Sequence, residues 1–261
     1  MKLQNLLLFI FLASFVSCGK EASIRSNCLP TNLQNGLIAF YPFSNGSLED
    51  KSAYSNHLNN PTSALPTNDR SGNMNCAFRF ENSLRFRTEF LTTSNSSFLN
   101  NLDKFSISIW YQPLERVIFE KNIEVLLGRG NDEKRCPDRM GEWSVGLYDC
   151  RHAVFGHNSS VWAKPITSSN DCAEEYVALT NKWHHVVATK SDTLFKIYFN
   201  GILNGTKSGN GACSNLHLAQ DIGDMFIGTA YTGRIDDILI YNRELSALEV
   251  TELFNLEPCC Q

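Results

Sequence analysis

Two adjacent acids, Asp236 and Asp237, stand inside an apolar run that extends from Ile235 to Tyr241. The run is rich in β-branched and aromatic residues, so it predicts a β-strand. Alternation along a strand gives Asp236 the direction of Ile238 and Ile240, toward the interior. A buried carboxylate is costly unless it is paired or bound to a cation. The segment therefore predicts either a metal ligand or an acid that is satisfied by an arginine or by backbone amides.

Paired carboxylates of the kind that cleave glycosidic bonds are not evident in the sequence. Retaining glycosidases hold an acid and a nucleophile about 5 Å apart, which on a strand requires that both lie on one face. Asp236 and Asp237 are consecutive and should point to opposite faces, while Glu174 and Glu175 fall in a predicted loop. We therefore expect no catalytic residues and no enzymatic activity.

The pair His184-His185 could suggest catalysis or zinc binding. Both residues stand in a predicted strand, 183–189, where we expect a structural role, with one ring packed inside and one directed outward. The chain has no Cys-x-x-Cys ladder with matching histidine spacing, which argues against a zinc site.

The first 17 residues have the features of an export signal. Lys2 precedes an apolar run, 3–16, that is too short to span a bilayer but suits a signal peptide. Phe15-Val-Ser-Cys18 resembles a bacterial lipoprotein cleavage box, with Phe15 where Leu is usual. We predict a lipidated Cys18 and anchoring in the bacterial outer membrane or at the cell surface, which the following Gly19 also favours. The alternative is ordinary secretion, with Cys18 as one more thiol.

The cysteines fit an exported protein. The chain has nine, and removal of Cys18 leaves an even number that an oxidising compartment can pair fully. We predict that Cys136 and Cys150 close a local loop. Cys259 and Cys260 are not expected to bridge each other, because adjacent residues strain the bridge geometry.

The net charge indicates which partners are disfavoured, and the glycosylation sequons bear on whether the protein is bacterial or eukaryotic. The formal net charge is −4, and no basic patch is present, which argues against nucleic acid binding and against polybasic membrane contact. Membrane contact would come through the lipid anchor only. Asn-x-Ser/Thr sequons would be glycosylation acceptors in a eukaryotic secreted protein, but the cleavage box favours a bacterium. They lie at Asn45, Asn95, Asn158 and Asn204.

Short strand patterns dominate the chain beyond a polar tether. Asn200-Gly201 is a strong hairpin signal, and Ser246 with Glu249 forms a capping box before a single late helix. No strand–helix–strand alternation is present, so we predict an all-β, two-sheet antiparallel sandwich. The predicted organisation is a signal peptide (1–17), a tether (18–35) and one domain (36–257). The candidate strands are 37–43, 76–80, 84–87, 105–111, 124–128, 143–147, 153–155, 183–189, 194–199, 225–228 and 235–241.

The order of these motifs resembles laminin-G-like, concanavalin A-like jelly-roll domains. The resemblance implies two packed antiparallel sheets with loops gathered at the rims. That architecture hosts lectins, adhesion modules and glycan-cleaving enzymes, so function must be argued from sites. The motifs that carry it are Leu37–Phe43, Asp50–His57, Ala77–Phe80, Phe105–Trp110, Trp183–Val187, Ile197–Gly201 and Gly233–Leu245.

The resemblance also implies a structural calcium ion near the domain edge. Asp50 and Asn56 occupy the place of the family's calcium loop, although Ala53 stands where Gly is usual. Calcium prefers six to eight oxygen ligands from carboxylates, amides and carbonyls. We expect Asp50, Asn56 and Asp236 as ligands, with Asp237 as a fourth candidate.

Sugars are held by exposed aromatic rings with short polar side chains nearby. Trp162, Tyr176, Tyr231 and Tyr148 lie in or beside predicted loops and are the candidate ligand-binding residues, whereas Phe105, Trp110 and Trp183 are expected in the core. We predict a non-catalytic glycan- or ligand-binding module of a cell-envelope lipoprotein. The alternatives are a protein-binding adhesion or structural surface module and, less favoured, a polysaccharide-degrading enzyme.

Overall fold

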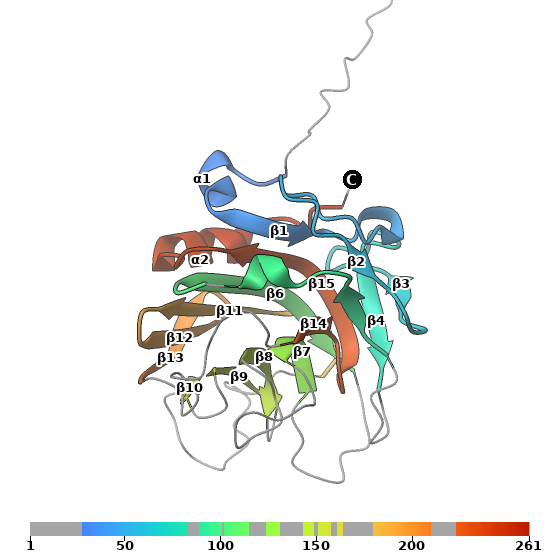
Figure 1. Cartoon of the computed structure of the whole chain (residues 1–261). Helices are drawn as coiled ribbons and strands as arrows, with labels where there is room; N and C mark the ends of the chain where they lie inside the picture. The colour runs from blue at the N-terminus through green and yellow to red at the C-terminus, as the bar shows by residue number, and fades with distance from the viewer. Residues whose placement is uncertain are drawn as a thin grey trace, which may run out of the picture.

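The computed structural model describes residues 28–82, 89–100, 102–114, 124–130, 143–148, 151–157, 161–163, 180–209 and 223–260. These residues form two antiparallel sheets packed face to face, with two short α-helices on one side (Figure 1). The prediction of an all-β, two-sheet sandwich with one late helix is confirmed. The predicted strand 84–87 lies outside the described residues.

The first sheet, called the A sheet, has the strand order β13-β12-β11-β6-β15-β4-β3, and β1 also pairs with β15. Its strands are β13 (Ile202–Ser208), β12 (Leu194–Phe199), β11 (His184–Ser191), β6 (Phe105–Pro113), β15 (Thr232–Tyr241), β4 (Ala77–Glu81), β3 (Leu65–Thr67) and β1 (Leu37–Tyr41).

The second sheet, called the B sheet, has the order β10-β9-β8-β7-β14-β5-β2. Its strands are β10 (Val161–Ala163), β9 (His152–His157), β8 (Trp143–Tyr148), β7 (Glu124–Gly130), β14 (Asp224–Ile227), β5 (Leu91–Thr93) and β2 (Leu58–Asn59). Two short 3₁₀ turns, η1 (Ser44–Gly46) and η2 (Ser97–Leu99), join strands.

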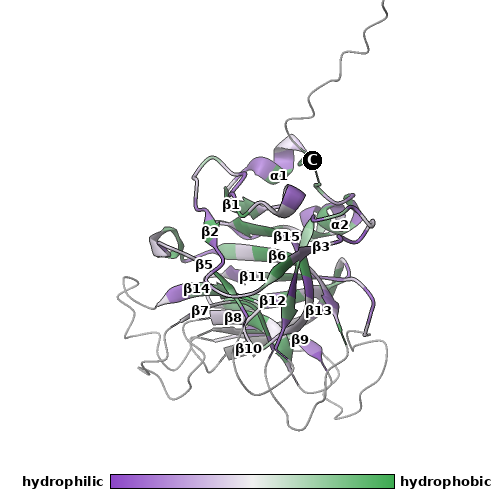
Figure 2. Cartoon of the chain, turned by 90° about the vertical axis from the view of Figure 1, so that its right-hand side faces the viewer, coloured by the Kyte–Doolittle hydropathy of each residue, from purple (hydrophilic) through white to green (hydrophobic). Residues whose placement is uncertain are grey.

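One apolar core fills the space between the sheets. Phe105, Ile107 and Ile109 alternate along β6 and are buried in it, as the sequence predicted. Figure 2 shows hydrophobic residues concentrated in the strands, whereas α1 (Thr31–Gln34) is largely hydrophilic. Burial of these side chains is the main stabilising term, at about 25 cal/mol for each Å² of apolar surface.

A second core lies on the outer face of the A sheet, beneath α1 and α2 (Ala247–Asn255). Leu33 from α1 and Leu253 from α2 pack there against Leu239 of β15. The predicted capping box starts α2, because the Ser246 side chain accepts from the Glu249 amide while Glu249 accepts from the Ser246 amide. The sheet is therefore covered on both faces over this region. No helix in the described part of the chain combines the length and apolar character that a membrane span needs.

Two disulfides fasten the C-terminal segment to distant parts of the chain. Cys28 bonds to Cys259, and Cys76 bonds to Cys260. Adjacent cysteines thus hold two different segments, which confirms that they do not bridge each other. The predicted pair of Cys136 and Cys150 lies outside the described residues.

Candidate functional site

A β-bulge in β15 decides where the two adjacent acids point. The register of β15 against β6 shifts between Asp236 and Leu239, and Asp237 has a φ of 39°. Such a bulge interrupts the alternation of side chains. Asp236 consequently lies opposite Trp110 on the outer face, while Ile238 packs in the core between the sheets. The predictions that Asp236 points inward with Ile238 and Ile240, and that the two acids face opposite ways, are wrong.

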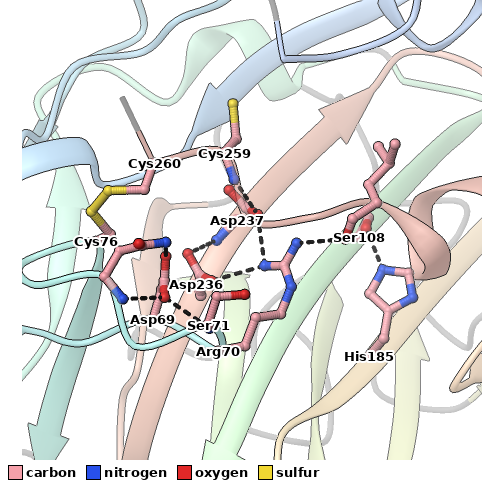
Figure 3. A network of polar contacts seen from close by, with 12 residues as sticks. Asp69, Arg70, Ser71, Cys76, Ser108, His185, Asp236, Asp237, Cys259 and Cys260 are labelled. Carbon is pink, nitrogen blue, oxygen red and sulfur yellow. Dashed lines mark hydrogen bonds and ion pairs between the residues drawn. A yellow bond between two sulfur atoms is a disulfide. The ribbon is translucent and has the colours of Figure 1, made fainter.

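Arg70, from the turn between β3 and β4, binds both carboxylates. Its Nη1 donates to Asp236 Oδ2 at 2.8 Å and to Asp237 Oδ2 at 2.7 Å, and its Nη2 donates to the Leu256 carbonyl at 3.1 Å (Figure 3). The guanidinium carbon also lies 4.5 Å from the centroid of the Trp110 ring. Of the alternatives left open by the sequence, the structure contains an arginine together with a backbone amide, since the Asp237 amide donates to Asp236 Oδ1 at 2.8 Å.

The electrostatics of this cluster follow from two buried acids that share one cation. Burial raises the pKa of Asp236 well above its usual range, the charge of Asp237 adds to the rise, and Arg70 opposes it. Burial likewise raises the pKa of Asp237, again opposed by Arg70. The amide of Cys259 donates to Asp237 Oδ2 at 3.2 Å, so the cluster also holds the disulfide-bonded C-terminal segment.

The expected calcium loop satisfies its own carboxylate. Asp50 accepts from the amides of Phe40, Ser52 and Asn56 at 2.8 to 2.9 Å, and also from the Ser52 hydroxyl at 2.8 Å. The Asn56 side chain donates to the Ile38 carbonyl at 2.9 Å. The Asp50 carboxylate therefore stabilises the conformation of its own loop by accepting hydrogen bonds from backbone amides, as aspartates in turns commonly do.

The four predicted calcium ligands do not assemble into one site. In the described ranges, one group of three acid, histidine or cysteine side chains has its ligand atoms within 4.8 Å, namely Asp69, Cys76 and Cys260. Two of its three ligand atoms are the sulfurs of a disulfide, so that group does not suit calcium. Asp50 is thus separate from Asp236 and Asp237, and Arg70 holds the position of a cation between those two. The residues do not fit the expected calcium ion.

The two histidines face opposite sides of the A sheet, as strand alternation predicted, and both are buried, the outward one included. His184 stacks on Phe199 with ring centroids 5.2 Å apart, and it faces Tyr111 on the inner side of the A sheet. His185 lies on the outer face, between Trp110 and Phe254 of α2. That face is covered because α2 packs over it.

Ser108 and His185 form a hydrogen-bonded pair, with Oγ and Nε2 2.8 Å apart. A nucleophilic serine needs a histidine that a third group orients, but His185 Nδ1 has no partner in the described structure. Burial, with the Arg70 charge, lowers the pKa of His185 to about 3. Ser108 lines a cavity of about 10 Å³, room for roughly one water molecule, which excludes an organic substrate.

The predicted ligand-binding aromatics are distributed differently from the expectation. Tyr231 is 0% exposed and donates to the Arg234 carbonyl at 3.3 Å, so it cannot serve as an exposed platform. Tyr148 ends β8 half-buried, opposite His152. Trp162 lies in β10 opposite Gly156, but its side chain is outside the described part of the structure. Tyr176 and the predicted lipidation residue Cys18 also fall outside it.

One aromatic residue was assigned to the wrong environment. Phe105 and Trp110 are buried as expected, but Trp183 is only half-buried and belongs to neither apolar core. It directly precedes β11, and the strand pattern 183–189 gave no signal that its first residue lies at the surface. A partly exposed ring at the surface is the kind of group that sugar binding requires.

The chain belongs to the concanavalin A-like lectin/glucanases superfamily, whose family model matches residues 87–251. This assignment agrees with the two antiparallel sheets and confirms the resemblance drawn from the motifs. No curated protein matches the sequence at a significant level.

Solved structures with a similar fold include the binding domains of toxins. The binding domain of botulinum neurotoxin DC in complex with SialylT has a TM-score of 0.62 and 18% identity, with 85% of this chain and 51% of that chain covered. The binding domain of Paraclostridial Mosquitocidal Protein 1 has a TM-score of 0.61 and 19% identity, with 85% and 52% covered. This chain therefore spans about half the length of those toxin structures.

A third structure corresponds over nearly its full length. Domain 4 of AbnA, an extracellular arabinanase from Geobacillus stearothermophilus, was solved in complex with arabinotriose. It has a TM-score of 0.57 and 15% identity, with 84% of this chain and 98% of that domain covered. At such identities the likeness establishes a shared fold.

Proposed function

We propose that this chain is a non-catalytic glycan-binding module of an exported cell-envelope lipoprotein. The observation that carries the proposal is the correspondence with the arabinanase domain solved with arabinotriose, of which 98% is covered. That neighbour is a whole domain, so the sugar it holds belongs to the part that this chain matches. A module of this size and fold can bind a saccharide without further domains.

The toxin neighbours support a binding role in a coarser way. They include structures described as complexes with SialylT and with rat synaptotagmin II. Because this chain matches about half of each, either half of those toxins could hold the ligand. The synaptotagmin complex favours the second candidate function, a protein-binding surface module.

The absence of catalysis in the proposal rests on the placement of the reactive groups. Asp236 and Asp237 are held by Arg70, and the Ser108–His185 pair is enclosed beside a cavity of about 10 Å³. These two groups therefore have structural roles, which supports a binding module. We retain the lipid anchor at Cys18 and the outer-membrane location as part of the proposal, on the cleavage-box residues given above.

The test is a glycan array probed with the exported chain, disulfides intact and folding verified by a cooperative melting transition. We expect binding to a defined family of saccharides with no release of reducing ends. Hydrolysis of any bound glycan would contradict the non-catalytic assignment, and silence on the array from a folded sample would favour the protein-binding alternative. Labelling with a radioactive fatty acid in the bacterial host, compared with Cys18→Ala, tests the anchor.

A further inference from the structure

Polar residues on adjacent strands form a line across the outer face of the A sheet. Arg79 of β4 lies directly opposite Arg234 of β15, and Arg234 lies opposite Gln112 of β6. Residues that are directly opposite share a face of the sheet. Arg234 alternates with Ile235, which is buried between the sheets, so the line faces outward.

Trp183 extends the line by one strand. Gln112 Nε2 donates to the Asn181 carbonyl at 3.0 Å, and the Asn181 amide donates to the Pro113 carbonyl at 2.7 Å. These bonds hold the segment before β11 alongside β6. Because His184 is opposite Tyr111, the register puts Trp183 opposite Gln112. We call Arg79, Arg234, Gln112 and Trp183 the arginine row.

The row contains like charges in an unfavourable arrangement. Two arginines directly opposite each other on neighbouring strands destabilise a sheet. Arg79 has a partner, Glu81 Oε2 at 2.8 Å, in a pair that is about half exposed. The Arg234 guanidinium, in contrast, has no hydrogen bond or ion pair within the described residues. The fold itself gives no reason for a second arginine at this position.

Unpaired polar atoms gather at the same place. Arg234 Nε, Gln112 Oε1 and Thr232 Oγ1 are all buried without a hydrogen-bond partner in the described structure. Thr232 is 5% exposed and lies on the face of Arg234, two residues along β15. Buried polar groups are nearly always satisfied, and leaving one unsatisfied is costly. A donor fork, an amide acceptor and a hydroxyl that all lack partners point to a polar ligand.

We propose that the arginine row is the glycan-binding surface and that its ligand is an acidic oligosaccharide, one that carries carboxylates. This inference rests on the proposed function. The planar fork of Arg234 matches a carboxylate, Gln112 can accept from a sugar hydroxyl, and the Trp183 ring offers an apolar face for a pyranose. The row crosses three strand intervals of about 4.8 Å, or roughly 14 Å, which suits an oligosaccharide rather than a single sugar.

The charges around the row support an acidic ligand. Asp236, the next residue on the same face of β15, is paired with Arg70, and Glu81 is paired with Arg79. Arg234 is therefore an uncompensated positive charge in a chain whose formal net charge is −4. The net negative charge of the protein does not attract anions from a distance. A local positive charge such as Arg234 therefore favours ligands whose anionic group can reach it directly.

The test compares a uronic-acid oligosaccharide with its carboxyl-reduced, neutral counterpart by isothermal titration calorimetry, using the exported chain. We expect the acidic form to bind at least about tenfold more tightly, and Arg234→Gln to remove about tenfold of that affinity while the neutral form is little affected. Lys207→Gln is the matched control, since it removes one positive charge from the exposed edge strand β13. Trp183→Ala should weaken both ligands.

The melting temperature of the variants distinguishes a binding role of Arg234 from a structural role. Because Arg234 opposes Arg79, Arg234→Gln should keep or raise the melting temperature while binding falls. If the folded chain binds a neutral glycan and the variants at Arg234 and Trp183 bind it unchanged, the glycan-binding function stands and the row is overturned. Equal loss with Lys207→Gln also overturns the row. If the folded chain binds neither form nor any arrayed glycan, both proposals fail.

Discussion

Arg70 Nη1 lies 2.7 Å from Asp237 Oδ2 and joins the turn between β3 and β4 to the bulge in β15. The two residues are 167 positions apart in the sequence, and Arg70 also bonds to Asp236. The same guanidinium reaches the Leu256 carbonyl, so one side chain links a hairpin turn, a central strand and the C-terminal segment. From the sequence, Asp236 and Asp237 suggested a metal site. In the structure they instead form ion pairs with Arg70 that connect distant segments of the fold.

Removal of Arg70 should destabilise the fold strongly. Arg70→Met would leave two buried carboxylates without their cation, which typically costs about 3 to 5 kcal/mol. Urea unfolding followed by tryptophan fluorescence measures the change. The control is Lys51→Met, because Lys51 and Glu49 form an exposed pair that should leave the midpoint unchanged. A loss for Arg70→Met no larger than that of the control would contradict the structural role.

Chelation of divalent cations should leave the melting temperature unchanged. Arg70 already occupies the position between Asp236 and Asp237, and Asp50 accepts from donors of its own loop. A ligand that binds the native state alone raises stability in proportion to the logarithm of its concentration. Differential scanning calorimetry in EDTA and in millimolar calcium checks this. A melting temperature that rises with calcium concentration would reveal a site other than the predicted one.

Stability should fall on acidification in a window set by His185. Its folded pKa of about 3 lies below the ordinary value of 6.5, so the unfolded chain binds the extra proton between these pH values. The contribution of His185 is therefore present above about pH 6.5 and declines toward pH 3, with a slope of at most about 1.4 kcal/mol per pH unit.

His185→Gln isolates this effect. Glutamine can keep a hydrogen bond to Ser108 but does not titrate. The urea midpoint of the variant should depend less on pH than that of the wild-type chain between pH 7 and pH 4. Parallel pH profiles for the two proteins would show that His185 can be protonated in the folded state.

The disulfide pattern can be checked by peptide mapping. Because Cys28 bonds to Cys259 and Cys76 to Cys260, a non-reducing digest should yield one three-part species that contains Cys28, Cys76 and the C-terminal peptide. Mass spectrometry before and after reduction identifies it. A species that joins Cys28 directly to Cys76, with the C-terminal peptide separate, would contradict the structure.

Sequence alone determined the elements whose signals are local. Alternation in Phe105, Ile107 and Ile109 predicted β6 and its buried face, because a strand repeats every two residues. Asn200 and Gly201 predicted the β12–β13 hairpin, and both have the positive φ angles that such a turn requires. Ser246 and Glu249 predicted the start of α2, since a capping box satisfies the first amides of a helix within four residues.

Only the tertiary structure decided which face each polar side chain occupies and which partner it binds. A bulge places Asp236 and Asp237 on one face, and the poor β propensity of two adjacent acids was its sole local signal. The partner, Arg70, comes from a distant turn, and the opposition of Arg234 to Arg79 depends on the register between β15 and β4. Register and long-range pairing are sums of many small contacts between segments remote in sequence, so no local pattern records them.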